Sequence, residues 1–220
     1  MSLPLSHRIS DNSIERINKM NATIYKDYTI EIDYDELIDN PRDWDNLSTM
    51  IFFHKRYDLG DKHDYNADDF TGWNEMRNQL IKDFDPAVIS YVHMLDHSAL
   101  SFSMQSFNGR SPYAHWDSGI VGFILITRET MRKEYKWKKL TSKRQEKLYQ
   151  YMKGELETYQ AYCNGEVYYY TINDPDDDFV DSCGGYYDTD EMLSECKSII
   201  DNIVQRKEGK LWDHIPVLAD

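Results

Sequence analysis

Cysteine, long apolar runs and positive charge are all scarce in this sequence, and each scarcity excludes a class of protein. The 220 residues include 3 cysteines, Cys163, Cys183 and Cys196, and no C-x-x-C pair. An odd number of isolated cysteines argues against a disulfide framework and against a four-thiolate zinc site. We therefore expect free thiols in a reducing cytosol.

No apolar run approaches the roughly 18 residues that a transmembrane helix needs. Residues 1–11 contain one Arg and no apolar core, so a signal peptide is not expected either. The sequence therefore predicts a cytoplasmic protein without a membrane partner.

Positive charge is scarce overall but concentrated in one place. The chain has 25 Lys and Arg against 39 Asp and Glu, a net charge of −14, which opposes nucleic-acid binding by the surface as a whole. Residues 131–153 nevertheless hold nine basic and two acidic residues, whereas residues 154–220 have a net charge of −12. We interpret 131–153 as a basic helix that packs beside acidic groups of its own fold. Direct nucleic-acid binding through it is the weaker alternative.

Hydrophobic periodicity and turn residues predict a mixed fold. Strands are expected at residues 23–33, 45–53, 88–95, 99–107, 119–127, 166–173 and 179–187, and helices at 72–84, after Thr127, at 142–164 and at 189–206. The segment 119–127 (GIVGFILIT) has no polar face and should be the central, buried strand. Thr127 is the expected N-cap of the helix that follows it, and Thr189 or Asp190 that of the last helix.

Strands and helices mix irregularly and not as βαβ units, which favours an α+β fold with a mostly antiparallel sheet and helices packed on one side of it. We expect a single α+β domain at residues 23–208. A poorly ordered N-terminal segment, 1–22, should precede it, and a C-terminal tail, 209–220, should follow it.

Polar residues gather in four short segments next to predicted strand ends. The resulting polar cluster consists of His54, Asp61, His63, Asp96, His97, Trp116, Asp117 and Asp181. We favour the interpretation that the Asp and Ser side chains close turns by bonding to nearby backbone amides. A metal site of His and carboxylate ligands is an alternative, which requires at least three of these groups to converge.

No established catalytic spacing accompanies these segments. The sequence lacks H-E-x-x-H and G-x-S-x-G, and no local positive charge would activate Cys183 as a nucleophile. We therefore assign no catalytic residue, no metal ligand and no cofactor. A hydrolase built from the Asp, His and Ser turns at one sheet edge, with or without a metal, stays open as the alternative function.

Several motifs together resemble one family. They are WDNLSTMIFFHKRYDLGDKH, LDHSALSFS, HWDSGIVGFILITRETMRKEY, ELETYQAYCNGEVYYYTI and DSCGGYYD, which span roughly residues 40–205. They are similar to the WDNLG, DHSG, PWDSGQVG and DSCWGFYG turns of an uncharacterised family of proteins encoded in tailed phages and prophages. The chain departs from that pattern at Ser48 and Ala99, where the family usually has Gly, and at FNGRSPYAH before Trp116. The resemblance implies a phage context, in the cytoplasm of an infected bacterium, and no particular chemistry.

An acidic phage protein without a catalytic motif is expected to be a binding protein and not an enzyme. The expected partner is a host defence or nucleic-acid-processing protein, inhibited by an acidic face that imitates a phosphate backbone and docks on a basic surface. The contact residues predicted for this face are Asp174, Asp176, Asp177, Asp178, Asp188, Asp190 and Glu191. A solvated acidic surface that only favours solubility is the simpler alternative.

Overall fold

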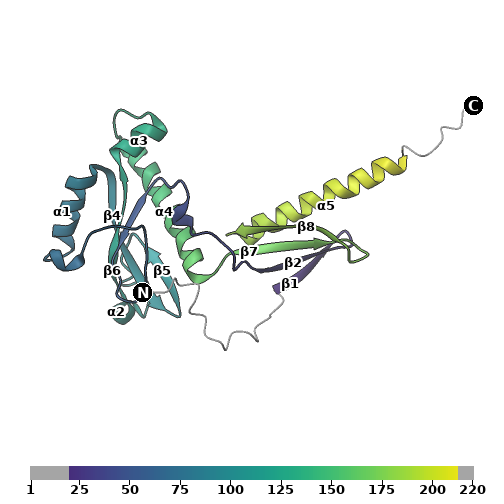
Figure 1. Cartoon of the computed structure of the whole chain (residues 1–220), viewed down its shortest axis with the longest axis horizontal. Coiled ribbons are helices and arrows are strands. Elements are labelled where there is room, and N and C mark those ends of the chain that lie inside the picture. Colours follow the sequence, from purple (N-terminus) through teal and green to yellow (C-terminus); the bar gives the residue numbers. More distant parts are fainter. Residues whose placement is uncertain (1–19, 213–220) are drawn as a thin grey trace, which may run out of the picture. The chain divides into compact units, whose positions relative to one another are not determined.

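The chain folds into two compact units. The computed structural model describes residues 20–212, and of these Asp39–Asn164 belong to the first unit, while 20–38 and 165–212 belong to the second (Figure 1). Each unit has one four-stranded sheet in which every neighbouring pair of strands is antiparallel. The predicted α+β class with antiparallel sheets is confirmed. The range 23–208, expected to be one domain, contains parts of both units.

The first unit has the sheet order β3-β6-β4-β5. Its elements are the 3₁₀ turn η2 (Pro41–Asp43), β3 (Thr49–Phe52), the 3₁₀ turn η3 (Ala67–Asp69), α1 (Trp73–Phe84), β4 (Pro86–His97), β5 (Ala99–Ser103), α2 (Ala114–Asp117), β6 (Ser118–Thr127), α3 (Arg128–Tyr135) and α4 (Ser142–Asn164). Its helices α1 and α4 lie on opposite sides of this sheet (Figure 1).

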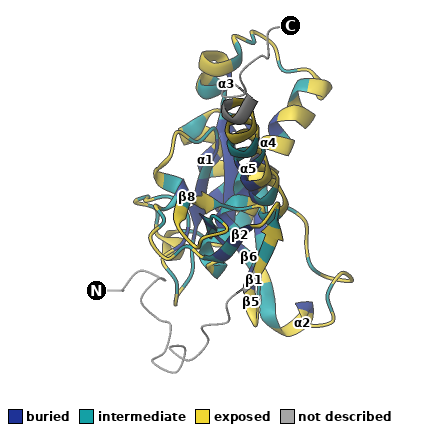
Figure 2. Cartoon of the chain, turned by 90° about the vertical axis from the view of Figure 1, so that its right-hand side faces the viewer, coloured by how far each residue is buried: buried dark blue, intermediate teal, exposed yellow. Residues whose placement is uncertain are grey.

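Helices on both faces explain why β6 has no polar face. Ile124 and Ile126 belong to the core that includes Leu148 and Met152 of α4. Phe123 of the same strand belongs to the core shared with α1. The predicted central, buried strand is thus confirmed, and buried residues concentrate in this sheet (Figure 2). The expectation of helices on one side only is wrong for this unit, because alternation alone does not show what covers each face.

The backbone of β3 leaves no room for a side chain at Gly122 of β6. A Cβ atom on Gly122 would lie 2.1 Å from the carbonyl oxygen of Ile51 and 2.8 Å from the Cα atom of Phe52. No side chain fits there without moving the backbone of β3.

The second unit has the sheet order β1-β2-β7-β8 and one helix. Its elements are β1 (Met20–Tyr25), β2 (Tyr28–Tyr34), β7 (Tyr168–Asn173), β8 (Phe179–Tyr186) and α5 (Thr189–Trp212). The buried side chains of α5, Met192, Cys196 and Ile200, share a core with Tyr28, Ile30, Ile32, Tyr170 and Ile172 of the sheet. One face of this sheet is therefore covered by α5.

Several element boundaries differ from the sequence prediction. The strand predicted at 23–33 is a hairpin of β1 and β2, because Lys26 and Asp27 adopt positive φ angles of 50° and 66° and reverse the chain. Two consecutive positive φ values are typical of tight hairpin turns, but Gly and Asn are the usual residues there. The basic segment 131–153 is not one helix, since it comprises the end of α3, a loop and the first half of α4.

The helix caps are partly as predicted. Thr127 caps α3, because its side chain accepts a hydrogen bond from the backbone N–H of Thr130 at 2.9 Å. The cap of α5 is Asp188 and not Thr189 or Asp190, since the Asp188 carboxylate accepts from the backbone N–H groups of Asp190 and Glu191 at 2.8 and 3.2 Å. The carboxylate thereby satisfies two of the free donors of the first turn.

The predicted terminal segments are only partly within the described residues. Residues 20–22 of the expected N-terminal segment belong to β1, and residues 209–212 of the expected tail belong to α5. Residues 1–19 and 213–220 lie outside the described range.

A buried arginine joins three separate segments of the first unit. The Arg42 side chain is 4% exposed. Its Nε and Nη2 atoms donate to the two oxygens of Asp61 at 2.7 and 2.9 Å, and Nη2 also donates to the carbonyl of Ser48 at 2.7 Å. Burial alone would lower the pKa of Arg42, but Asp61 and Glu155 raise it overall, so the guanidinium stays charged.

Two carboxylates complete this network. Glu155 of α4 accepts from the backbone N–H groups of Leu47 and Ser48 at 2.7 and 3.1 Å and from the Ser48 hydroxyl. Asp61 accepts from the backbone N–H of Met50 in β3 at 2.8 Å. The segments before and after β3 are thereby fixed to the sheet and to α4.

We predict that Arg42→Met destabilises the protein by about 3 kcal/mol, because it leaves two inward-facing carboxylates without their cation. This value is at the lower end of the destabilisation expected when one partner of a buried ion pair is removed, since the side chains of Asp61 and Glu155 are still 21% and 18% exposed. Urea unfolding measures the change, with Arg132→Met as the exposed control, which should stay within about 0.5 kcal/mol of wild type. Equal stability of the two variants would contradict the role given to the network.

Candidate functional site

A cleft of about 290 Å³ lies at one end of the first unit's sheet. Its polar and aromatic lining comprises His54, Arg56, Asp96, Trp116, Asp117 and Ser118. These residues meet because β3 and β4 end where β6 begins, as antiparallel neighbours of β6 must. Sequence segments more than 60 residues apart thus share one edge.

His97 and Asp117 form a hydrogen-bonded pair beside this cleft. The Nδ1 atom of His97 lies 2.8 Å from Oδ2 of Asp117, and the imidazole stacks on the ring of Tyr113 with centroids 3.7 Å apart. A carboxylate only accepts hydrogen bonds, so Nδ1 carries the proton and Nε2 of the neutral ring is an acceptor. This is the arrangement in which a carboxylate orients a histidine for use as a base.

His54 has a different role at the same edge. Its Nδ1 atom accepts hydrogen bonds from the backbone N–H groups of Arg56 and Tyr57, both at 3.3 Å, and its ring stacks on Tyr57. Burial and the nearby Arg56 lower the pKa of His54 below its usual 6.5, against the opposing charge of Asp96. His54 is therefore a neutral residue that holds the turn after β3.

Arg56, Asp96 and Trp116 complete the lining. The Asp96 carboxylate accepts from the Arg56 guanidinium and, at 3.3 Å, from the Tyr57 hydroxyl. Trp116 of α2 is 83% exposed, and His115 meets it edge-on at 4.7 Å. The cleft thus offers an arginine and an exposed indole, with an oriented histidine, His97, beside it.

Five members of the predicted polar cluster lie in or beside the cleft, and three lie elsewhere. The five are His54, Asp96, His97, Trp116 and Asp117. Asp61 binds Arg42, the Nε2 atom of His63 lies 2.9 Å from the carbonyl oxygen of Phe52, and Asp181 accepts from the Tyr170 hydroxyl in the second unit. Arg56 and Tyr113 were not part of the predicted cluster. Arg56 is two residues after His54, but its proximity to Asp96, like that of Tyr113 to His97, depends on long-range packing that no local signal shows.

The interpretation of Asp96, Asp117 and Asp181 as turn-closing residues is wrong. Each of these carboxylates pairs with a side chain far away in the sequence. Such turn closure occurs instead at Asp174, whose Oδ1 atom accepts from the backbone N–H groups of Asp176 and Asp178 at 3.0 and 3.1 Å.

The described residues show no convergent ligand set of the kind that the metal hypothesis requires. Within residues 20–212, no group of three His, Cys, Asp or Glu side chains is placed to hold a metal ion.

The thiols have no base beside them either. Burial raises the pKa of Cys163 to about 12 and that of Cys196 to about 11. Cys183 lies in the second unit, whose described residues contain no histidine. Cys183 therefore has no histidine as a base partner within the described residues of that unit.

A larger hollow, of about 640 Å³, lies between the end of α1 and the start of α3. Asp83, Asp85, Glu129, Arg132 and Lys133 contribute charges of both signs to its lining. Its lining includes no member of the predicted cluster and no histidine, so the smaller cleft is the better candidate for chemistry.

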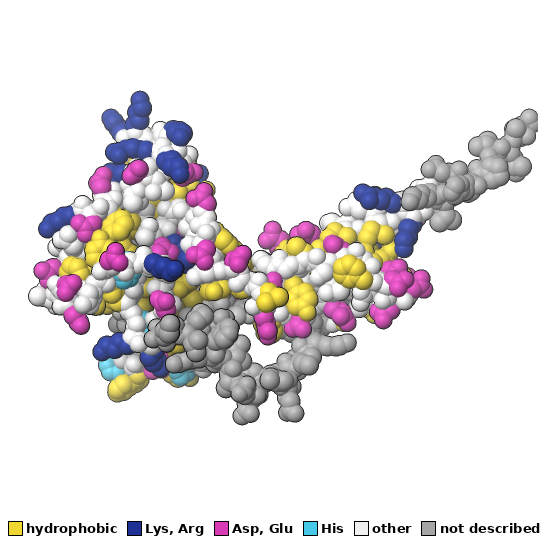
Figure 3. All heavy atoms as spheres, in the orientation of Figure 1, with side chains coloured by type: hydrophobic (Ala, Val, Ile, Leu, Met, Phe, Trp, Pro, Cys, Tyr) yellow, Lys and Arg dark blue, Asp and Glu magenta, His cyan; other side chains and the backbone are white. Residues whose placement is uncertain are grey.

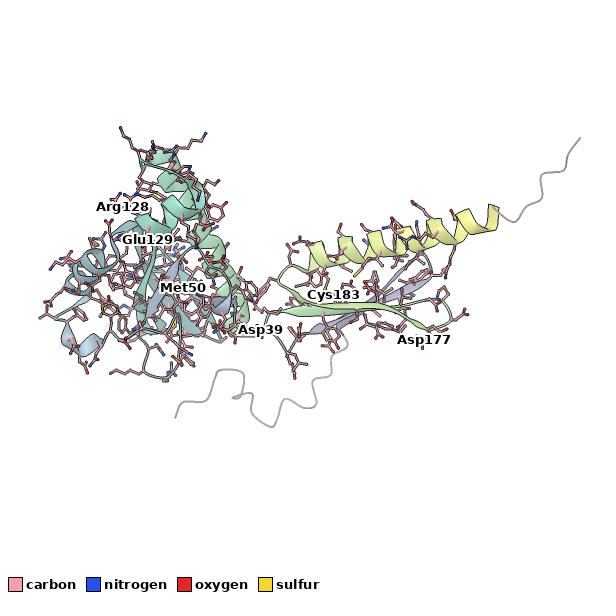
Figure 4. All side chains as sticks on the ribbon, turned by 45° about the horizontal axis from the view of Figure 1, so that its top comes forward. Asp39, Met50, Arg128, Glu129, Asp177 and Cys183 are labelled. Atoms are coloured by element: carbon pink, nitrogen blue, oxygen red, sulfur yellow. The ribbon has the colours of Figure 1, made fainter. Side chains whose placement is uncertain are left out.

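The predicted acidic contact residues form two groups in the second unit. Asp174, Asp176, Asp177 and Asp178 belong to the turn between β7 and β8, where Figure 4 shows Asp177. Asp188, Asp190 and Glu191 lie at the start of α5, beyond the other end of β8. Because β8 has eight residues, the two groups are roughly 25 Å apart.

Charge is divided very unequally between the two units. Residues 39–164 have 18 acidic and 17 basic residues. The described part of the second unit has 17 acidic and 5 basic residues, a net charge of −12. Acidic side chains accordingly occur along its visible face in Figure 3, between apolar and other side chains.

Comparisons with known proteins give no further guide to the site: no family model matches the chain, and no curated protein or solved structure is significantly similar to it. Among the helices of residues 20–212, none is both long and apolar enough to cross a membrane.

We predict that His54 makes the folded protein sensitive to acid. Its pKa is lowered on folding, so the unfolded chain binds the proton more readily, and stability should fall as the pH decreases through about 6.5. His54→Asn keeps an acceptor near the position of Nδ1 but does not titrate, so its stability should fall less.

Urea unfolding of both proteins between about pH 8 and pH 5.5 tests this prediction. At the higher pH the imidazole is neutral in both the folded and the unfolded state. The difference in free energy of unfolding between the two proteins at that pH therefore gives the packing cost of the substitution. A pH dependence identical in the two proteins would show that His54 does not contribute.

Proposed function

We propose that this protein is a non-catalytic binding protein that docks its acidic second unit on a basic surface of a host protein. The observation that supports this most is the charge division, since a net charge of −12 is confined to one compact unit and the other is almost neutral. A nucleic-acid-processing or defence protein of an infected bacterium would present such a basic surface, in line with the resemblance to a phage family.

The acidic residues of this unit divide into structural and available ones. Asp174 and Asp188 accept backbone hydrogen bonds and define the shape of the hairpin turn and of the helix start. Asp176, Asp178 and Asp190 are exposed and form no ion pair with the described residues of their unit. The available acids are thus held in place by the structural ones.

The spacing of the two acidic groups suits a partner with an elongated basic groove. Their separation of roughly 25 Å equals about seven nucleotide steps of 3.4 Å along one DNA strand. A channel that binds duplex nucleic acid presents cations over such a length. Attraction of this kind acts mainly on the association rate and is screened by salt, with a Debye length of about 8 Å at physiological ionic strength.

We predict that the triple variant Asp176→Lys, Asp178→Lys and Asp190→Lys loses partner binding while keeping its fold. Asp177 is left unchanged because its φ of 66° would strain a lysine. The matched control is Asp64→Lys, Asp68→Lys and Asp69→Lys, which changes the net charge equally at exposed positions of the first unit.

Wild type and both variants serve as baits in a bacterial lysate, and the retained protein is identified and purified. Its association rate with each bait is then measured against ionic strength. We expect the second-unit variant to associate at least tenfold more slowly, with a flatter salt dependence, and the control to behave like wild type. Equal association rates for the two variants would show that only the net charge of the protein matters, and would refute a specific acidic face.

The His97–Asp117 pair favours a second candidate function, a hydrolase that activates water. With Asp117 bonded to Nδ1, the Nε2 atom of His97 is the group that takes a proton from a bound water. The Ser118 hydroxyl is not poised as a nucleophile, since it donates to the carbonyl of Ala114 at 2.6 Å. Arg56, which lines the cleft, would hold an anionic substrate group.

If this second function holds, Asp117→Asn should lower kcat by about 10²- to 10⁴-fold, because the imidazole loses its orienting charge. Hydrolysis of p-nitrophenyl esters and phosphates is the measurement, and Asp58→Asn, an exposed carboxylate of the neighbouring loop, is the control. Absence of turnover by wild type, or equal turnover by Asp117→Asn, would count against the hydrolase.

A further inference from the structure

We propose that the exposed end of the first unit where α3 meets α4 binds the phosphate backbone of nucleic acid. We call this surface the basic tip and define it by Lys136, Lys138, Lys139, Lys143, Arg144 and Lys147. The proposal goes beyond the acidic docking function, because it concerns the other unit and a surface of opposite sign.

The backbone places these cations on a short, protruding connection. Helix α3 ends at Tyr135, Lys136 adopts a left-handed conformation with φ of 56°, and α4 begins at Ser142. Five of the six side chains are exposed, and Arg144 is half-buried. Lys and Arg side chains gather visibly at this end of the first unit in Figure 3.

The cations of the basic tip are not neutralised by their own unit. Within residues 39–164, none of the six has a carboxylate oxygen within 4.0 Å. The acid in the same stretch, Glu146, accepts instead from the side chain of Gln150 at 2.7 Å. The expectation that the basic segment 131–153 packs beside acidic groups is therefore met at Lys133 and Lys153, which lie 4.0 and 3.2 Å from Glu134 and Glu157, but not at the basic tip.

Two internal hydrogen bonds fix the shape of the tip. The Nζ atom of Lys136 donates to the carbonyl of Lys133, and the Arg144 guanidinium donates to the carbonyl of Lys139, both at 2.6 Å. These bonds hold the loop between α3 and α4 closed without removing any charge.

Aromatic rings support the charged groups from beneath. Tyr135 and Trp137 stack with centroids 4.4 Å apart. Arg144 lies 5.0 Å above the Trp137 ring, and Lys147 lies 5.0 Å above the Tyr135 ring. Cation–π interactions orient side chains that would otherwise be freely mobile, which reduces the entropy cost of binding an anion.

The composition of the surface favours nucleic acid over an acidic protein. Protein interfaces depend on apolar or aromatic anchors that become buried, and in residues 128–153 the one exposed large hydrophobic side chain is Tyr151, 42% exposed, with Lys147 5.6 Å above its ring. Phosphate backbones need only Lys and Arg, which this surface has. Because cations cover the rings of Tyr135 and Trp137, base stacking is not offered, and binding should be independent of sequence.

The chain's overall acidity does not prevent local binding. Charges further apart than about 8 Å are largely screened at physiological ionic strength, so the local balance matters most. Residues 136–147 contain six basic residues and one acidic residue.

The test uses the full chain and a fluorescently labelled DNA duplex of about 20 base pairs, followed by anisotropy over a range of salt concentrations. The variant Lys138→Gln, Lys139→Gln, Lys143→Gln removes three exposed charges that form no ion pair with the described residues of the first unit, and Lys55→Gln, Lys62→Gln, Lys82→Gln is its matched control. We expect at least tenfold weaker binding by the tip variant. The slope of the logarithm of its binding constant against the logarithm of salt concentration should be smaller in magnitude by about 0.9 for each phosphate that the variant no longer neutralises.

Three results would overturn the proposal. Equal DNA binding by the tip and control variants would show that no local site exists. Equally tight binding of poly-glutamate by wild type would indicate an acidic protein as the partner. Concentration-dependent oligomers at low salt that the tip variant abolishes would identify the acidic unit of a second copy as the occupant.

The acidic docking function and this proposal fail independently. The second-unit variant, Asp176→Lys with Asp178→Lys and Asp190→Lys, should bind the duplex at least as well as wild type. If it does not bind DNA, the site is not the basic tip.

Discussion

The buried guanidinium of Arg42 is the interaction on which the first unit depends. It connects the segment before β3, the loop after β3 and helix α4, by pairing with Asp61 and approaching Glu155. Each partner also accepts backbone N–H groups, so neither carboxylate nor cation can leave without exposing unsatisfied groups to the interior. The loop that carries His54 and the helix that begins at the basic tip are both held by this network.

The way each sheet is covered explains where charge is placed. In the first unit helices pack on both faces, so charged groups lie on the outer sides of the helices, at helix ends and in loops, among them the cleft and the basic tip. In the second unit α5 covers one face. On β2, Thr29, Glu31 and Asp33 alternate with the buried residues of that face and therefore point to the other side. Acidic charge is thus concentrated on the second unit, while the nearly neutral first unit has one local basic surface, a distribution suited to two dissimilar partners.

The candidate cleft was partly predictable, because polar residues cluster next to strand ends. Asp96, His97 and Asp117 follow or precede apolar strands, and antiparallel pairing of β4 with β6 brings those ends together. The same reasoning placed Asp61, His63 and Asp181 wrongly. Asp61 is required by Arg42, and Asp181 belongs to a strand of the other sheet. Local polarity shows that a side chain needs a partner but does not show which one it finds.

The sequence by itself determined the α+β class, the central position of β6 and the extents of α1 and α4, because continuous or periodic hydrophobicity is a local property. It also contained the uneven charge, and the cap at Thr127 was evident from one residue. Only the tertiary structure decided that the strands form two sheets in two units. It also decided that helices cover both faces of one sheet and that His97 pairs with Asp117. These outcomes depend on pairings across long stretches of chain, whose free energies arise from packing and buried hydrogen bonds that no local pattern specifies.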